Sequence, residues 1–181
     1  MISIISGTNR AENNSLYIAQ FLHGCYSEAN IESQILDLQN LPSELFTSEA
    51  YGEKPTDFVK NFSDPVLESD GLHIVVGEYN GSFPGVLKYF IDMLPFPEAF
   101  EARPTAFTGL SAGDHGGIRA VEQLQMIFSY RNAHTFPKRV FLPRIFQVLD
   151  ENGALIDNEL ITRLRKQTKE FNSFIRAIRK H

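Results

Sequence analysis

The feature that most constrains the fold is the alternation of short apolar runs with longer segments of helical period along the 181 residues. This alternation is typical of α/β proteins, in which helices cover both faces of a parallel sheet. The predicted strands span 2–6, 32–38, 71–77, 105–110 and 139–142. The third run is almost wholly apolar, as expected of a central strand. We therefore predict a three-layer, doubly wound sheet of five parallel strands whose binding crevice lies at their carboxyl ends.

Helices are predicted between these strands and after the last one. They span 15–29 and 57–62, follow Pro84 as far as Ile91, carry Ile118 to Phe128, and close the chain with an apolar stripe from Leu160 to Ile178. Prolines interrupt 39–69, where only one short helix is expected. The sequence FQVLDENGALID indicates a small hairpin with its turn at 151–153.

Composition places the chain among ordinary globular proteins. It is 43% hydrophobic and 22% charged, so we expect a single domain over 1–181 that needs no disulfide or metal clip. Cys25 falls on the apolar side of the first helix with Ile18 and Leu22, which predicts a buried, inert thiol. No signal-like segment or membrane-length apolar stretch occurs, and we expect a cytoplasmic protein.

The charge balance argues against nucleic-acid or membrane partners. Seventeen basic and 22 acidic residues give a net charge of −5, which does not favour capture of polyanions. Basic residues do gather near the C-terminus: Arg163, Arg165, Lys166, Lys169, Arg176, Arg179 and Lys180. A basic arm is one interpretation, but apolar residues recur among them at helical spacing, which favours a solvated helix face.

Three loops of unusual composition follow the first, third and fourth strands and so open on one sheet edge. The first begins Gly7-Thr8-Asn9-Arg10 and reaches Ser15. Its hydroxyls, amides, guanidinium and helix-start amide groups suit a phosphate dianion. It matches neither a Walker loop nor G-x-G-x-x-G. The alternative is a helix cap by Asn14 or Ser15, with Arg10 in solvent.

The other two loops are rich in glycine. The second, GEYNGS from Gly77, combines glycines with a flat aromatic ring and an amide, as a site for a planar ligand requires, although Asn-Gly is also an ordinary turn former. The third, SAGDHGG from Ser111, precedes a helix and offers backbone amides. Its His115 is either a proton donor or a surface residue. The five histidines form no H-x-x-x-H pattern, and no catalytic triad, paired carboxylates or metal set stands out.

Together these loops resemble those of a known family. GEYNGSFPGVLKYFID, from Gly77 to Asp92, resembles the P-E-Y-N-x-S-x-P-G-x-L-K-N-A-I-D signature of the NADPH-dependent FMN reductase family, which includes azo- and quinone-reducing members. GTNR with Ser15 resembles its phosphate loop, and SAGDHGG with Arg119 its third flavin loop. The likeness runs from Met1 to about Leu142, and beyond that only the final helix corresponds.

The resemblance implies a flavodoxin-like fold with strand order 2-1-3-4-5, bound FMN, NADPH as donor and a homodimer or homotetramer. By position, it implies that the FMN phosphate is held by Thr8, Arg10 and Ser15, with Asn14 and Leu16 close by. The isoalloxazine would lie against Glu78, Tyr79, Asn80, Gly81 and Ser82, with Ser111, Gly113, Gly116 and Gly117 opposite.

The sequence departs from the family pattern at three places. Gly77 replaces a usual proline, which loosens the flavin loop, while Tyr89-Phe90 replaces Asn-Ala and Met93 replaces a common tryptophan. The last two put oligomer packing and acceptor choice in doubt more than flavin binding.

The expected activity is transfer of a hydride from NADPH through FMN to a small acceptor such as a quinone, an azo compound or a flavin. The cofactor would carry the redox chemistry, which explains the lack of a catalytic side-chain set. One alternative is a non-enzymatic, flavodoxin-like electron carrier, although the first loop lacks the flavodoxin pattern. Another is a binding protein that has lost the flavin. No 2′-phosphate clamp that would select NADPH over NADH is evident in the sequence.

Overall fold

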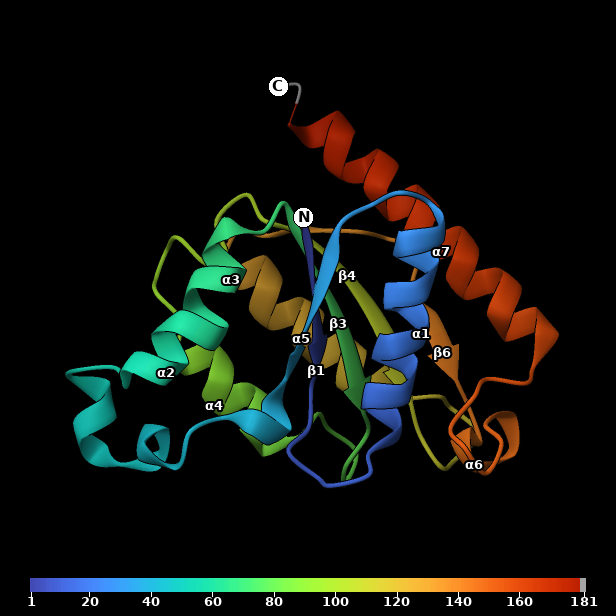
Figure 1. The fold of residues 1–181 in the computed structure, drawn as a ribbon, viewed down its shortest axis with the longest axis horizontal. Coiled ribbons are helices and arrows are strands. Elements are labelled where there is room, and N and C mark those ends of the chain that lie inside the picture. The colour runs from blue at the N-terminus through green and yellow to red at the C-terminus, as the bar shows by residue number, and fades with distance from the viewer. Residues whose placement is uncertain (180–181) are drawn as a thin grey trace.

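Parallel pairing of the apolar runs builds the sheet in the computed structural model, which describes residues 1–179 (Figure 1). Its strands are β1 (Ile2–Ser6), β2 (Ser33–Asp37), β3 (Gly71–Gly77), β4 (Pro104–Leu110), β5 (His134–Thr135) and β6 (Val140–Leu142). The order is β2-β1-β3-β4-β5, with β6 also paired to β4, and every pairing is parallel. The predicted doubly wound, flavodoxin-like order 2-1-3-4-5 is confirmed.

The outer edge beyond β4 differs from the prediction of one strand at 139–142. Two short strands share this edge: β5 pairs with the start of β4, and β6 with its end. Pro137 lies between them and has no amide hydrogen for the ladder, so pairing is interrupted there. The described part of the sheet therefore has six strands in five positions.

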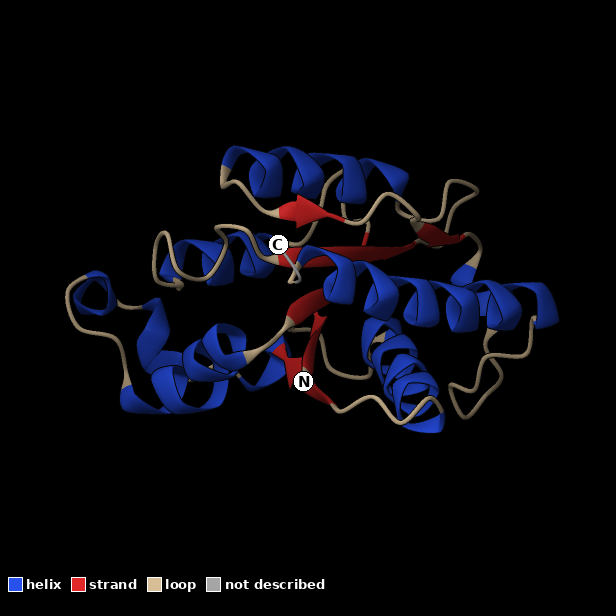
Figure 2. Ribbon diagram, turned by 90° about the horizontal axis from the view of Figure 1, so that it is seen from above, coloured by secondary structure: helices blue, strands red, loops and turns tan. Residues whose placement is uncertain are grey.

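Helices cover both faces of the sheet, as Figure 2 shows from above. On one face lie α1 (Asn14–Glu28) and α7 (Asn158–Ile178). On the other lie α2 (Thr56–Phe58), α3 (Asp64–Glu68), α4 (Gly85–Met93) and α5 (Ile118–Tyr130). Alternate strand residues feed the two layers: Ile74 and Val76 pack in one core and Val75 in the other. Cys25 is buried in α1 as predicted, and burial raises the pKa of its thiol.

The helical segment before β3 is longer than the predicted 57–62. Three 3₁₀ turns occupy Leu38–Asn40, Ser43–Phe46 and Ser48–Tyr51, and a helix then runs from Thr56 to Glu68 through a π-helical turn at Val59–Ser63. Pro65 lies two residues after Ser63, the last residue of that turn. A proline ring clashes with the carbonyl four residues earlier in a regular α-helix, and the wider π turn gives it room.

A buried polar chain links the α1–α7 side of the sheet to β3 and β4. The Gln167 amide donates to two backbone carbonyls (2.9 and 3.0 Å), so its Oε1 accepts from the Thr108 hydroxyl at 2.9 Å. Thr108 Oγ1 in turn accepts from His73 Nε2 at 2.9 Å, and the Tyr26 hydroxyl donates to Nδ1 at 2.8 Å. This fixes a neutral imidazole, and burial lowers the pKa of His73 to about 3.

After β6, the chain forms α6 (Ile145–Val148) and a hairpin closed by the bridge between Leu149 and Leu155. The predicted hairpin is thus present, but its first residues belong to α6. Gly153 lies in the hairpin turn at φ +80°, and a Cβ at this position would clash with the ring of Tyr17. No helix within residues 1–179 has the length and apolarity needed to span a membrane. Lys180, counted above among the basic residues, lies outside the described residues.

Candidate flavin site

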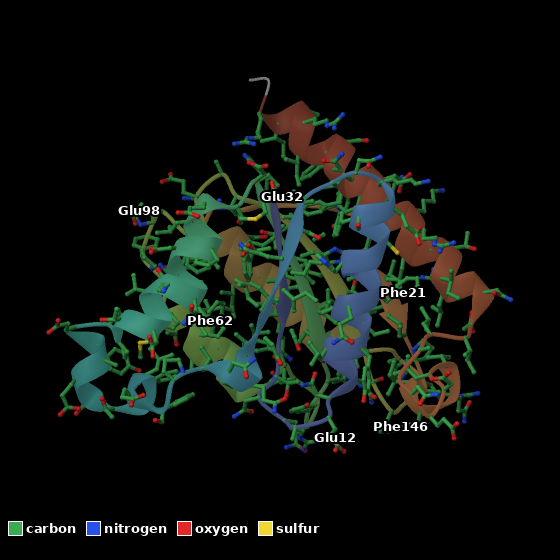
Figure 3. The ribbon with its side chains drawn as sticks, viewed as in Figure 1. Glu12, Phe21, Glu32, Phe62, Glu98 and Phe146 are labelled. Atoms are coloured by element: carbon green, nitrogen blue, oxygen red, sulfur yellow. The ribbon has the colours of Figure 1, made fainter. Side chains whose placement is uncertain are left out.

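A cavity of about 300 Å³ opens at the carboxyl edge of the sheet. Its walls come from the loop after β1, the end of β3, the end of β4 and the start of α6: Arg10–Ser15, Gly77–Tyr79, Leu110–Ala112, Ile145 and Phe146. Glu12 and Phe146 mark this edge at the bottom of Figure 3. The three loops predicted to share an edge do meet there.

Asn13 organises the first loop. Its Oδ1 accepts from the Leu16 amide at 2.7 Å and from the Ser6 hydroxyl at 3.3 Å, while its Nδ2 donates to the Arg10 carbonyl at 2.8 Å. The N-cap of α1 is therefore Asn13, not Asn14 or Ser15 as the capping interpretation expected. Asn14 and Ser15 form the first turn of α1 and line the cavity, where helix amides have no intrahelical acceptor and attract an anion.

Tyr79 ties the first loop to the second. Its hydroxyl lies 2.8 Å from Thr8 Oγ1, and the Arg10 guanidinium carbon lies 4.3 Å from its ring centroid. This separation is that of a cation–π contact. Thr8 is fully buried and supports the loop from beneath, whereas Arg10 is exposed and lines the cavity.

The rest of the second loop is a tight turn braced from α5. Asn80 and Gly81 have φ of +52° and +76°, and Tyr79 and Ser82 exchange backbone hydrogen bonds of 2.7 and 3.1 Å across them, as in a type I′ turn. Gln123 accepts from the Ser82 hydroxyl at 2.6 Å and donates to the Gly81 carbonyl at 3.2 Å. Asn80, Gly81 and Ser82 do not line the cavity, but their turn holds the preceding residues Gly77–Tyr79, which do.

Glu78 brings an unpaired acceptor to this wall. Its side chain is 11% exposed, and its Oε1 accepts from Arg119 Nη1 at 2.9 Å. Its Oε2 is buried and has no hydrogen-bond partner among residues 1–179. A buried oxygen without a donor is unfavourable, so a ligand with an N–H or O–H group would stabilise it.

The third loop contributes Ser111 to the cavity, while its glycines serve the packing behind it. Gly116 and Gly117 are buried at φ +60° and +84°. A Cβ on Gly117 would lie 2.7 Å from the Leu110 amide nitrogen, and one on Gly116 would lie 2.9 Å from that of Leu142. Glycine is therefore required where the loop folds back on β4 and β6. Gly113 and His115 are exposed and, with Leu16, lie outside the lining.

Ile145 and Phe146 were missed by the sequence analysis as site residues. Arg144, at φ +48°, turns the chain before them, and the Ile145 amide donates to the Ser111 carbonyl at 3.0 Å. Ile145 and Phe146 belong to no recognised motif, and the sequence from Phe146 onward indicated only a hairpin. The other lining residues not predicted as cofactor contacts are Ala11, Glu12, Asn13, Gly77, Leu110 and Ala112.

These residues suit a phosphorylated, planar cofactor. Arg10, the Asn14 and Ser15 amides and the positive end of α1 make one end of the cavity fit for a phosphate dianion. Glu78 Oε2 offers an acceptor to a ring N–H, and isoalloxazine carries one on its pyrimidine edge. No group of three or more His, Cys, Asp or Glu residues in 1–179 could hold a metal ion. Fold and site together define a flavodoxin-like protein with a site that fits FMN.

Comparison with known proteins gives the family. Residues 1–147 match the family model described as NADPH-dependent FMN reductase, and the chain belongs to this family. An NAD(P)H-dependent FMN reductase of Pseudomonas aeruginosa is 27% identical over 149 residues, covering 81% of this chain and 80% of the relative. A quinone reductase of Pseudomonas putida is 30% identical over 161 residues, covering 86% and 84%.

A solved structure gives the same fold. FerB, the flavoenzyme NAD(P)H:(acceptor) oxidoreductase of Paracoccus denitrificans, superposes with a TM-score of 0.80 at 20% identity, covering 99% of this chain and 97% of FerB. The predicted family and the class of FMN- and NAD(P)H-dependent oxidoreductase are confirmed. The family match ends within α6, at residue 147, and the hairpin after it lies beyond the match.

Proposed function

We propose that this protein catalyses electron transfer from NADPH, through bound FMN, to a small acceptor such as a quinone, an azo compound or a free flavin. One observation carries the proposal. A cationic, amide-rich loop and Glu78, whose buried Oε2 has no hydrogen-bond partner in residues 1–179, line the same cavity at the carboxyl edge of the sheet. A ligand with a phosphate at one end and a flat hydrogen-bonding ring at the other satisfies both.

The phosphate end is assigned to Thr8, Arg10, Asn14 and Ser15, with Leu16 behind them. Arg10 supplies charge, and the Asn14 and Ser15 amides supply directed donors. Thr8 is buried and holds Tyr79 through the 2.8 Å contact, so it acts on the phosphate end through the position of the second loop.

The ring end is assigned to Glu78 and Tyr79, with Ser111 opposite, because these residues line the cavity. The turn of Asn80, Gly81 and Ser82 and the loop glycines Gly113, Gly116 and Gly117 are assigned to the segments that carry these walls. Arg119 holds Glu78, and Gln123 holds the Asn80-Gly81 turn. The wall against which a ring would lie is therefore braced before the ligand arrives, which limits the ordering cost of binding.

When bound, FMN supplies the redox chemistry by accepting a hydride from NADPH and passing the electrons to the acceptor. The chain's own part is to bind, orient and stabilise charge. Backbone amides of the loops and the Arg119 guanidinium, which lies against Glu78, set the electrostatic field at the ring edge. No side chain is assigned a covalent or proton-transfer role.

The test is a visible spectrum of the purified protein, loaded with FMN and desalted, before and after NADPH is added without oxygen. We expect the flavin bands to be retained, to bleach with NADPH and to return when a small quinone is added. Parallel runs with NADH measure the choice of donor. Flavin that is retained but not reduced would identify a carrier instead, and absence of retained flavin would contradict both assignments.

We also propose that the protein forms a homodimer or homotetramer. Large apolar side chains stay exposed on the isolated chain: Phe46, Tyr51, Phe96, Met126, Tyr130, Phe146 and Ile156. Such side chains are enriched at contacts between subunits. Light scattering should give two or four times the 20.5 kDa chain mass, and a monomer would contradict this proposal.

A further inference from the structure

Phe146 is an aromatic side chain held open at the mouth of the cavity. It lines the cavity, yet its side chain is 72% exposed, and Figure 3 places it at the lower edge of the molecule. Exposing most of a phenyl ring to water is unfavourable. At the rim of a binding cavity, that exposed apolar surface is typical of a ligand contact.

The backbone that carries Phe146 is anchored to the third loop. Arg144 takes the left-handed conformation, its Nε donates to Asp114 Oδ1 at 2.6 Å, and its amide donates to the Gly113 carbonyl at 3.0 Å. Ile145 is buried beneath. The turn that carries Phe146 is thus anchored to the third loop at Gly113 and Asp114, which sets the position of its backbone before any ligand binds.

Phe146 also offers an aromatic face over which no Arg or Lys side chain of residues 1–179 lies. Tyr79 is the other aromatic side chain in the lining, and the Arg10 guanidinium lies over its ring at 4.3 Å. The remaining walls are largely polar or small side chains. A flat ligand entering the cavity therefore finds its stacking surface at Phe146.

We infer that Phe146 is a specificity-determining residue that stacks on the flat conjugated ring of the molecule in the cavity. This inference rests on the proposed function. Two molecules carry such a ring, the isoalloxazine of FMN and an aromatic acceptor, and their binding is measured separately. Ile156 provides the matched control, because it lies in the neighbouring hairpin, is 55% exposed and does not line the cavity.

The first experiment compares Phe146→Ala, Phe146→Leu and Phe146→Trp with Ile156→Ala. Flavin fluorescence gives the FMN dissociation constant, and steady-state kinetics of the FMN-loaded protein give KM for a naphthoquinone and for ferricyanide, which has no ring. We expect Phe146→Ala to weaken either FMN binding or the naphthoquinone KM by about tenfold. Phe146→Trp should retain both, Phe146→Leu should fall between, and ferricyanide KM and Ile156→Ala should stay unchanged.

A weaker FMN affinity identifies the flavin as the stacking partner, and a raised naphthoquinone KM with unchanged FMN affinity identifies the acceptor. The inference is overturned if Phe146→Ala matches Ile156→Ala in both, or if Phe146→Leu matches the unmodified protein in both. A changed mass in light scattering with both constants unchanged also overturns it, because a second copy would then cover the ring.

A second experiment does not depend on turnover. The chain contains no tryptophan, so Phe146→Trp and Ile156→Trp each carry a single one. FMN or naphthoquinone should protect the tryptophan at 146 from iodide quenching and leave the one at 156 accessible. Equal accessibility with and without both ligands would overturn the inference, even if the protein retained FMN and oxidised NADPH. Protection by naphthoquinone alone, in a protein that did not retain FMN, would separate this inference from the proposed function.

Discussion

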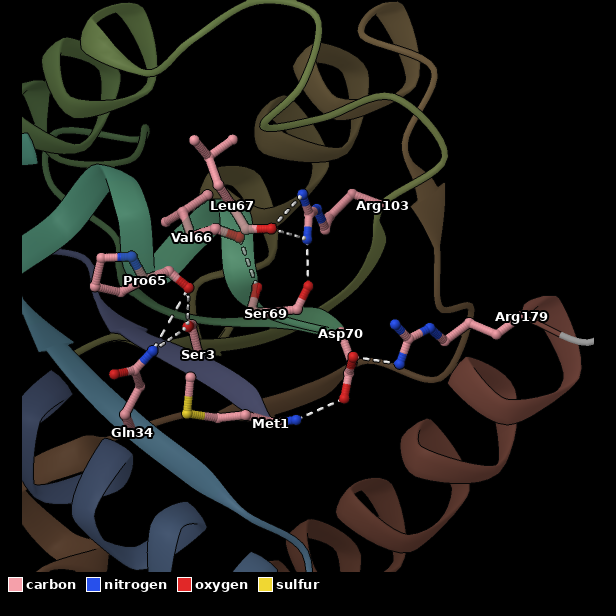
Figure 4. A network of polar contacts seen from close by, with 10 residues as sticks. All are labelled: Met1, Ser3, Gln34, Pro65, Val66, Leu67, Ser69, Asp70, Arg103 and Arg179. Atoms are coloured by element: carbon pink, nitrogen blue, oxygen red, sulfur yellow. Dashed lines mark hydrogen bonds and ion pairs between the residues drawn. The ribbon is translucent and has the colours of Figure 1, made fainter.

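The two ends of the strands differ in whether their polar groups have partners within the protein. We call the amino edge, where they do, the closed edge, and the carboxyl edge, where some do not, the open edge. At the amino edge, drawn in Figure 4, Arg103 donates to the carbonyls of Leu67 and Ser69, and Asp70 accepts from the chain N-terminus and from Arg179. At the carboxyl edge, Arg10 is exposed and Glu78 Oε2 has no partner in residues 1–179. Polar groups stabilise the fold where they are satisfied internally and can bind a ligand where they are not.

The pKa of Asp70 reflects the closed edge. Burial alone would raise it, but hydrogen bonds and charge from the N-terminus and Arg179 hold the pKa of this carboxyl below its usual range. At the carboxyl edge, Arg119 contacts one oxygen of Glu78, and the other has no hydrogen-bond partner in residues 1–179. Substitutions of Arg103 and Arg10 therefore separate folding stability from FMN affinity.

The largest expected effect comes from opening the closed edge. Arg103→Met keeps the aliphatic stem but removes the donors to the carbonyls of Leu67, Ser69 and Glu98. Leaving such carbonyls unsatisfied should lower the free energy of unfolding by about 3 kcal/mol, measured by urea denaturation. Lys88→Ala, which removes an exposed pair with Asp92, should cost at most about 0.5 kcal/mol. An FMN affinity that fell with Arg103→Met would contradict the separation of the two edges.

Arg10→Ala should have the opposite effect, lowering FMN affinity while leaving the free energy of unfolding nearly unchanged. Loss of a charge-assisted hydrogen bond to phosphate is worth about 1.5–3 kcal/mol, or roughly tenfold to a hundredfold in FMN affinity. The free energy of unfolding without ligand should barely change, because the Arg10 side chain is exposed. Arg163→Ala on the exposed face of α7 is the control. An unchanged dissociation constant in a flavin titration would reject the phosphate role of Arg10.

As pH falls, protonation linked to the buried His73 should lower the free energy of unfolding before protonation of Asp70 at the closed edge does. The folded pKa of His73, about 3, lies below its ordinary 6.5, so the unfolded chain binds the extra proton between these values and stability falls as pH falls. At pH 5 the loss is about 2 kcal/mol, from 1.36 kcal/mol per pKa unit. The contribution of Asp70 is lost only below pH 3.8, its ordinary pKa. Denaturation at pH 7 and 5 tests this, and His73→Gln should flatten the difference.

The sequence predicted what depends on local pattern. Apolar runs located the strands, and glycine-rich loops located the open edge, because both signals lie within a few neighbouring residues. The break at Pro137 was missed, since its effect depends on the register of that edge against β4. The π turn before Pro65 was missed because the proline was taken to end a helix rather than widen it.

The missed site residues entered through tertiary contacts. Ile145 and Phe146 reach the cavity because β6 pairs with β4 and the Ile145 amide binds the Ser111 carbonyl, and no local signal encodes that. Thr8 was assigned to the phosphate but lies buried beneath the loop, with its hydroxyl on Tyr79, 71 residues away. Only the folded chain reveals that the two loops are coupled.

That coupling yields the smallest of the predicted effects. Tyr79→Phe removes the 2.8 Å contact with Thr8 but keeps the ring beneath Arg10. A neutral hydrogen bond is worth about 1 kcal/mol, so FMN affinity should fall about fivefold if the contact holds the empty site in its binding shape. Tyr130→Phe, whose side chain is 82% exposed on α5, should change nothing. A gain in affinity for Tyr79→Phe would mean that Thr8 must leave Tyr79 to reach the phosphate, and that the open edge, like the closed one, is partly satisfied internally before its ligand arrives.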